Sequence, residues 1–141
     1  MQTFLPFDSY TKSAAVLDNK RLNKQRIELI QITNALTLPS YGWKNHPAVK
    51  MWEGAIPSLM DYWEAIELQC RARGFKPRPV PEHLWFEHTG HVPSWVGNEE
   101  FHLSHRLNLL FKDPAWYSTK FNEPVPLTKP EYYWPTKQGK V

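Results

Sequence analysis

The chain contains the stretch Asp18-Asn19-Lys20-Arg21-Leu22-Asn23-Lys24-Gln25-Arg26-Ile27-Glu28, which decides how the fold is built. An α-helix turns by about 100° per residue, so side chains three or four positions apart share one side of it. The apolar positions that share a side predict a buried helix face: Leu17, Leu22, Leu29, Ile32 and Leu36. Polar residues lie on the same stripe: Asp18, Arg21, Gln25 and Glu28.

The buried polar stripe has two interpretations. Burial of a carboxylate or a guanidinium is costly unless the group is paired, so such residues are rarely placed on a buried face without a partner. The four side chains either form an internal network of ion pairs and amide bonds that orders the helix, or they converge on one side as the floor of an active site.

Length and composition indicate an ordinary globular protein. The chain has 141 residues, of which 41% are hydrophobic and 22% are charged, and this predicts a single domain over residues 1–141. Its single cysteine, Cys70, excludes an internal disulfide and a thiolate zinc site and favours a reducing compartment. We therefore expect a cytoplasmic monomer without a signal peptide or a membrane-spanning segment.

Charge is distributed unevenly along the chain. Residues 1–50 hold seven Lys or Arg against three Asp or Glu, residues 51–104 hold four against eight, and residues 105–141 hold six against three. If the two basic ends meet in the folded chain, they form a positive face that suits a polyanion such as nucleic acid. The alternative is a solvated charge pattern without a partner.

The spacing of apolar residues, caps and prolines predicts a protein made mostly of helices. The expected helices run from a cap at Asp8 or Ser9 to Val16, from a cap at Asp18 to about Leu36, from Pro47 to Cys70 with a stop at Gly74, and from Asn98 to Lys112. Pro57 should kink or divide the third of these. Residues 76–97 should be irregular, and from Asp113 onward we expect an extended aromatic tail. The predicted fold class is all-α, a single compact helical domain.

The end of the chain alternates basic residues with large aromatic ones. Ser104-His105-Arg106-Leu107 is followed by Lys112-Asp113-Pro114-Ala115-Trp116-Tyr117-Ser118-Thr119-Lys120-Phe121. Cations beside flat rings offer phosphate contacts together with stacking surfaces, a combination that nucleic-acid-binding proteins use. The alternative is that these aromatic residues fold the tail back onto the core.

The order of several short motifs resembles the pyrimidine-dimer DNA glycosylase family, whose phage member is also called endonuclease V. The motifs are Arg73-Gly74-Phe75, Ser104 with Arg106-Leu107, and Pro114 with Trp116-Tyr117. The resemblance follows nearly the whole chain and includes the basic second helix. The opening Met-x-Thr-Phe-Leu-Pro and the stretch Leu-Asp-x-x-Arg-Leu-x-Lys-Gln-Arg are also similar to bacterial and phage proteins usually grouped with this family.

The resemblance implies a DNA glycosylase with AP-lyase activity. In this family the N-terminal α-amine attacks the sugar C1′ of a damaged nucleotide, forms an imine and cleaves the strand by β-elimination. A glutamate on a helix assists, basic residues hold the kinked double-stranded DNA, and no metal or cofactor is required. An α-amine suits this role because its pKa near 8 leaves a neutral fraction at pH 7.

The resemblance also implies a set of catalytic residues. Gln2 is large, so Met1 should be retained and should supply the amine. Alignment of the helices on Arg26 without a gap places Asn23 at the family's glutamate position, but Asn23 is not on the buried stripe. We therefore expect Glu28 to be the acid, with Asp18 as the second choice. The expected catalytic residues are Met1, Glu28, Asp18, Arg21 and Gln25, where Arg21 and Gln25 orient the acid or the nucleotide.

The expected DNA contacts lie on the basic helix and near the end of the chain. They are Lys24, Arg26, His105, Arg106, Lys112, Trp116, Tyr117 and Lys120. We also expect the first 15 residues to lie against the helical core, so that the amine reaches the polar stripe.

Other functions remain open on the sequence alone. A DNA-binding protein without catalysis would share the basic face, and a related glycosylase could act on a different modified base. A metal-dependent hydrolase would use the histidines, since pairs at i and i+3 can share one ion. The histidines in question are His83, His88, His91, His102 and His105.

Overall fold

The structure is a computed structural model that describes residues 2–42, 44–78 and 92–135. Regular secondary structure within these ranges is entirely α-helical, which confirms the predicted all-α class. The helices are α1 (Tyr10–Val16), α2 (Asn19–Thr37), α3 (Pro47–Lys50), α4 (Ile56–Ala72), α5 (Glu99–Lys112) and α6 (Pro114–Tyr117).

Three helices begin at the capping residues that the sequence predicts. The side chains of Ser9, Asp18 and Asn98 accept hydrogen bonds from the backbone amides three residues further on, which satisfies donors left open at the start of a helix. The predicted helix from Pro47 is divided before Pro57, because the chain turns after α3 and Pro57 occupies the first turn of α4.

The tail begins with one helical turn that the sequence analysis did not predict. The Asp113 side chain accepts a hydrogen bond from the Trp116 amide at 3.2 Å, and Pro114 occupies the first turn. These two start signals form α6 in spite of the aromatic composition that follows. Residues 118–135 then continue without helix or strand.

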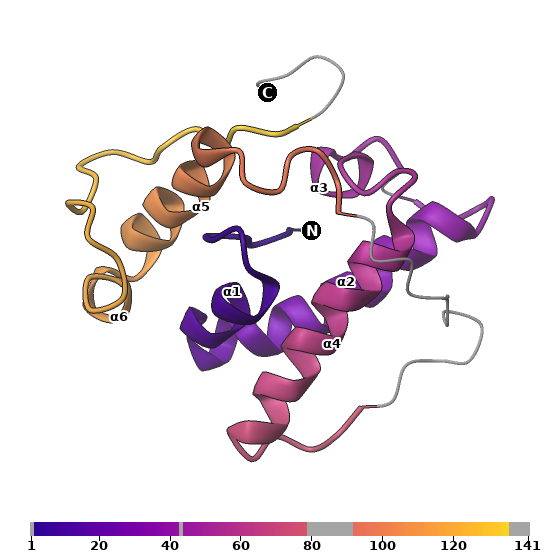
Figure 1. Ribbon diagram of the computed structural model, residues 1–141, viewed down its shortest axis with the longest axis horizontal. Coiled ribbons are helices and arrows are strands. Elements are labelled where there is room, and N and C mark those ends of the chain that lie inside the picture. The colour runs from indigo at the N-terminus through magenta and orange to yellow at the C-terminus, as the bar shows by residue number, and fades with distance from the viewer. Residues whose placement is uncertain (1, 43, 79–91, 136–141) are drawn as a thin grey trace.

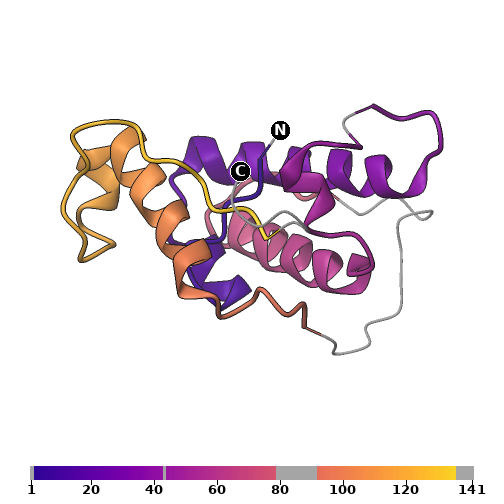
Figure 2. The same ribbon diagram turned by 90° about the horizontal axis from the view of Figure 1, so that it is seen from above.

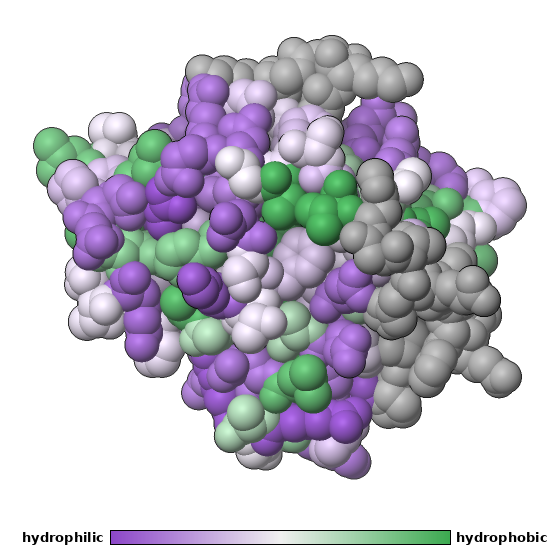
Figure 3. Space-filling view, viewed as in Figure 1, coloured by the Kyte–Doolittle hydropathy of each residue, from purple (hydrophilic) through white to green (hydrophobic). Residues whose placement is uncertain are grey.

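Helices α1 and α2 both pack against α4, and α6 packs against α5. The core between α2 and α4 is made of fully buried aliphatic side chains: Leu22, Leu29, Ile32, Leu59 and Ile66. The N-terminal segment, residues 2–7, runs through the middle of the molecule between α5 and the α2–α4 pair, as Figures 1 and 2 show. Polar residues cover most of the face seen in Figure 3, with apolar residues in small separate groups.

No helix in the described ranges is long and apolar enough to cross a membrane. The single cysteine, Cys70, is a buried free thiol on α4.

Candidate active site

Gln25 of α2 binds the start of the chain to this helix through two hydrogen bonds. Its side chain is fully buried; its Nε2 donates to the Gln2 carbonyl at 2.8 Å, and its Oε1 accepts from the Phe4 amide at 2.6 Å. One amide side chain therefore bonds the backbone on both sides of Thr3. This contact fixes the position of Gln2 relative to α2.

The α3–α4 region holds the same segment from a second direction. The Thr3 hydroxyl donates to the Ala48 carbonyl and accepts from the Trp52 indole N–H, both at 3.2 Å. The Tyr62 hydroxyl donates to the Phe4 carbonyl. Since buried backbone groups require partners, these bonds let an extended segment pass through the core.

Helix α5 completes the attachment with residues that lie about 100 positions away in the chain. His102 Nδ1 is 2.8 Å from the Leu5 carbonyl, and the Leu5 amide donates to His105 Nδ1 at 3.4 Å. Arg106 Nη1 donates to the Pro6 carbonyl at 2.9 Å. Burial, together with the charges of His102 and Lys112, lowers the pKa of His105 to about 3, and burial also lowers the pKa of His102. Both imidazoles are therefore neutral at pH 7.

Glu28 lies one helical turn beyond Gln25 on the same side of α2. Its side chain is only 6% exposed, and its Oε1 is 3.9 Å from Nζ of the largely exposed Lys24. A second cation, Lys112, interacts electrostatically with Glu28 and with three other cations, Arg21, Lys129 and Lys24. We call Arg21, Lys24, Lys112 and Lys129 the cationic rim.

Lys112 joins the cationic rim to the N-terminal segment. Its ammonium donates to the Tyr132 hydroxyl at 3.3 Å and lies 5.3 Å from the centre of the Phe4 ring. Partial desolvation and the charges of the other rim cations lower the pKa of Lys112. Burial raises the pKa of Tyr132 to about 12, against the opposing effects of Arg21 and of a hydrogen bond with the Gln2 side chain.

Asp18 is engaged at the start of α2. Its carboxylate caps the helix, pairs with Arg21 Nη1 at 3.2 Å and accepts a hydrogen bond from the Tyr117 hydroxyl. Burial would raise the pKa of Asp18, but the bonds from Tyr117 and Arg21 lower it. The ion pair of Arg21 is thus with Asp18, whereas the ion pair of Glu28 is with Lys24.

The structure divides the expected DNA contacts into exposed and enclosed residues. Lys24, Lys112 and Lys120 are exposed. The ammonium of Lys120 lies over the ring of the half-buried Trp116, 5.0 Å from its centre. The other four are buried and bonded inside the protein: Arg26 to Glu67, His105 to Leu5, Arg106 to Pro6, Glu99 and Glu123, and Tyr117 to Asp18.

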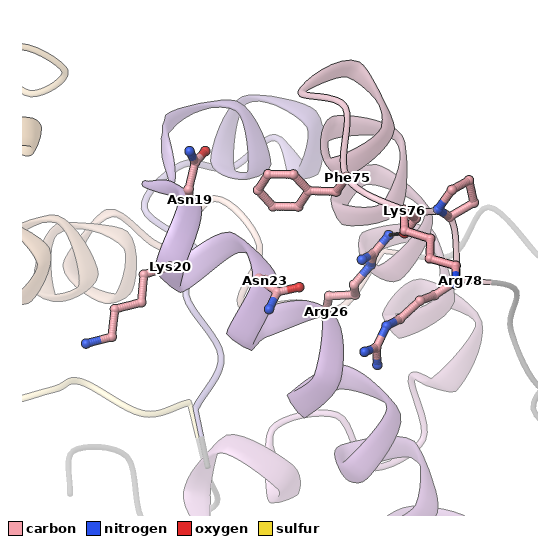
Figure 4. A pocket seen from close by; sticks show the side chains of 8 residues that line it. Asn19, Lys20, Asn23, Arg26, Phe75, Lys76 and Arg78 are labelled. Atoms are coloured by element: carbon pink, nitrogen blue, oxygen red, sulfur yellow. Dashed lines mark hydrogen bonds between the residues drawn. The ribbon is translucent and has the colours of Figure 1, made fainter.

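A cleft of about 740 Å³ opens on the other side of α2 from Glu28. Its walls come from the first half of α2 and from the segment after α4: Asn19, Lys20, Asn23, Arg26, Phe75, Lys76, Pro77 and Arg78. Figure 4 shows Phe75 across from Asn19 and Asn23, with Arg26 and Arg78 at the other end and Lys20 extending outward from α2.

Arg26, which lines this cleft, forms a buried ion pair with Glu67. Arg26 Nε and Nη2 each donate to a Glu67 oxygen at 2.7 Å. Burial alone would raise the pKa of Glu67, but bonds from Arg26 and the Arg78 amide, with the charges of Arg26 and Arg71, lower it. Both side chains are therefore charged at pH 7.

Sequence reasoning missed Glu67, Lys129 and Tyr132. A signal for Glu67 was present, since a carboxylate three residues before Cys70 and four after Trp63 lies on the apolar stripe of α4. Lys129 and Tyr132 lie in an irregular segment, where no periodicity points to a shared site.

Two expectations fall outside the described residues: the position of Met1, and any metal site that uses His83, His88 or His91. Across residues 2–42, 44–78 and 92–135, no three His, Cys, Asp or Glu side chains are grouped so that they could hold a metal ion.

Comparison with known proteins gives one family. A family model described as pyrimidine dimer DNA glycosylase matches residues 1–83, more than half of the chain. Searches of curated proteins and of solved structures found no match. The matched residues include the N-terminal segment, Gln25, Glu28 and all of α4.

Proposed function

Since the chain belongs to the pyrimidine dimer DNA glycosylase family, we propose that it excises a damaged or modified pyrimidine from double-stranded DNA and then cleaves the strand as an AP lyase. The observation that carries this proposal is the attachment of Gln2 and Phe4 to Gln25. It holds the residue next to the N-terminal amine beside the helix face that carries Glu28. An amine nucleophile requires such positioning to react with a sugar carbon.

The proposed nucleophile is the α-amine of Met1, whose ordinary pKa near 8 leaves a neutral fraction at pH 7. The amine adds to C1′, the bond from C1′ to the base breaks, and the base leaves with the electron pair. The C1′–O4′ bond then breaks, O4′ takes up a proton that the amine loses, and a C1′ imine results. Loss of a proton from C2′ forms the C2′–C3′ double bond, the C3′–O bond breaks, and the phosphate leaves with the electron pair, which cleaves the strand.

We assign the proton transfers in these reaction steps to Glu28. Asp18 is the second candidate, but the cap, Arg21 and Tyr117 already engage its oxygens. Arg21 belongs to the cationic rim near Glu28, and Gln25 acts through the N-terminal segment. No metal or cofactor takes part in the proposed reaction.

For DNA binding we propose the exposed cations, Lys24 and Lys112 of the rim and Lys120 with Trp116. Phosphate contacts of this kind supply most of the affinity for DNA. Arg26, His105, Arg106 and Tyr117 support the surface from inside through their internal bonds.

We further propose that residues 1–141 form one domain. The reason is that Leu5 and Pro6, inside the matched region, are bonded by His102, His105 and Arg106, which lie beyond it.

Borohydride trapping tests the reaction, because reduction converts the imine into a stable covalent link between protein and DNA. Duplexes that carry a cyclobutane dimer, an abasic site or a modified pyrimidine are compared with undamaged DNA. We expect trapping on the abasic duplex and on at least one damaged duplex, with the DNA fragment attached to the N-terminal peptide. Trapping that survives chemical blocking of the N-terminal amine would contradict the proposed nucleophile, and DNA binding without trapping on any duplex would favour a non-catalytic binder.

A further inference from the structure

The first half of α2 has cations on both of its sides. The cationic rim lies on the side of Glu28, and the cleft with Lys76 and Arg78 lies on the opposite side. The exposed face of α2 that joins them carries Lys20 and Asn23, which line the cleft, and Lys24, which belongs to the rim. A helix with its side chains is about 10–12 Å across. The width of α2, which lies between the Glu28 side and the cleft, is therefore comparable with the width of a groove of B-DNA, about 6–12 Å.

The backbone of the cleft is held in place before any ligand arrives. Arg26 Nη2 donates to the Lys76 carbonyl at 2.7 Å, and the Arg78 amide donates to Glu67 Oε1 at 2.8 Å. The two side chains of this network, Arg26 of α2 and Glu67 of α4, are both buried. Because Glu67 neutralises Arg26, the positive charge offered to a ligand comes from the exposed Lys76 and Arg78, with Lys20 at the edge.

The remaining walls suit a nucleotide backbone. The amide groups of Asn19 and Asn23 can donate hydrogen bonds to phosphate oxygens. The ring of Phe75 is half-buried and offers an apolar surface for the carbon face of a deoxyribose. A volume of about 740 Å³ is within the range of ligand-binding clefts.

We propose that this cleft binds the sugar-phosphate backbone of the DNA strand complementary to the one held beside Glu28. This inference rests on the proposed function in that the damaged strand is assigned to the Glu28 side. It adds a second contact surface, which is needed only when the substrate is a duplex.

The test compares a Lys76→Ala, Arg78→Ala double variant with wild type on two substrates, an abasic duplex and the same abasic strand alone. The matched control is a Lys12→Ala, Lys50→Ala double variant, which removes the same charge from α1 and α3. The Kd is measured over a range of salt concentrations. Arg26 and Glu67 are unchanged in both variants, and the bond to Glu67 comes from the backbone amide of Arg78, so the melting temperature should stay near that of wild type.

We expect the cleft variant to bind the duplex roughly tenfold more weakly, with a salt slope about two units smaller, one for each lost phosphate contact. Its affinity for the single strand should equal that of wild type, and the control should match wild type on both substrates. An equal loss on the single strand, an unchanged duplex affinity, or an equal loss in the control would each overturn the inference. These are binding measurements, so they decide the question even if trapping fails and the proposed reaction is wrong.

Discussion

At the scale of single residues, Gln25 links the fold to the proposed chemistry. An amide that is fully buried needs both its donor and its acceptor satisfied, and Gln25 satisfies both on the backbone of one short segment. The sequence predicts its burial, because Gln25 lies on the apolar stripe of α2. It does not predict the partner, because Gln2 and Phe4 are more than 20 positions away.

Replacement of Gln25 by Met should separate positioning from DNA binding. Methionine has a similar length but leaves the Phe4 amide and the Gln2 carbonyl without this partner, at a cost of about 1–3 kcal/mol each. A displacement of the N-terminal amine by about 1 Å should slow trapping in single turnover about a hundredfold, while the Kd for DNA stays near wild type. Gln31→Met, on the same helix, is the control. A normal trapping rate in folded Gln25→Met would show that this contact does not position the nucleophile.

Replacement of Glu28 by Gln keeps the size of the side chain and removes its charge. If Glu28 transfers protons, turnover should fall about a hundredfold or more while the Kd for DNA changes little. Asp18→Asn is the comparison: asparagine caps a helix about as well as aspartate, so this change should mainly affect stability through the lost ion pair with Arg21, by about 1 kcal/mol or less. Single-turnover rates and melting temperatures on the same preparations distinguish the two carboxylates. Wild-type turnover in Glu28→Gln with a slow Asp18→Asn would move the assignment to Asp18.

Arg26 shows where sequence reasoning reaches its limit for a single residue. It lies in the basic stretch of α2, and from the sequence we expect it to contact DNA. In the folded protein it is buried, and its guanidinium donates hydrogen bonds to Glu67 of α4 and to the Lys76 carbonyl. A long charged side chain can follow a partner on another helix, and periodicity along its own helix contains no information about that partner.

At the scale of elements, the Arg26–Glu67 pair is a buried charged contact between α2 and α4. Removal of one partner of a buried pair leaves the other charge poorly compensated and typically costs about 3–5 kcal/mol, whereas replacement of both by apolar residues is often close to neutral. Arg26→Met and Glu67→Met should therefore each lower the free energy of unfolding strongly, and the double variant should recover most of the loss. Urea unfolding measures all three, with Lys20→Met, an exposed position of the same helix, as a control that should stay within about 0.5 kcal/mol of wild type. Additive losses in the double variant would mean that the two side chains contribute independently.

The elements themselves follow mostly from local signals. Caps and prolines predict where α1, α2 and α5 start, because these residues satisfy open amides without help from the rest of the protein. Helix α6 carries the same kind of signal in Asp113 and Pro114, but its four residues are too few for periodicity to appear. Short helices are therefore the elements that a reading based on periodicity overlooks.

At the scale of the whole molecule, the central position of residues 2–7 is the feature least accessible from sequence. An extended segment in a helical core must bond side chains from several helices, and here these come from α2, α4 and α5. The sequence shows the histidines of α5 as candidate ligands for a metal or for phosphate. The fold uses His102 and His105 for the backbone of Leu5, a choice that depends on bringing together residues about 100 positions apart.

The lowered pKa values of the same two histidines predict how the stability of the protein depends on pH. Their pKa values are lowered in the folded protein, so between the ordinary value near 6.5 and the folded value the unfolded chain binds protons that the folded chain does not. The contribution of these histidines to the free energy of unfolding should thus be fully present above about pH 6.5. Below that pH the free energy of unfolding should fall by about 1.4 kcal/mol per pH unit for each histidine that stays neutral in the folded protein. Asp18 and Glu67, whose pKa values are also lowered, add to this loss only below about pH 4.

Urea unfolding at several pH values between 7 and 4.5 isolates the contribution of the histidines. His105→Gln should be less stable than wild type at pH 7, because the Leu5 amide loses its partner, yet its stability should fall less steeply as the pH drops. The pKa of His46 is also lowered by burial, so His46→Asn measures the share of the slope that belongs to the loop before α3. A slope in His105→Gln equal to that of wild type would mean that His105 takes up a proton in the folded state, which requires Leu5 to leave its place between α5 and α2. In that case the trapping rate should fall over the same pH range, because the N-terminal segment that positions the proposed nucleophile would be released.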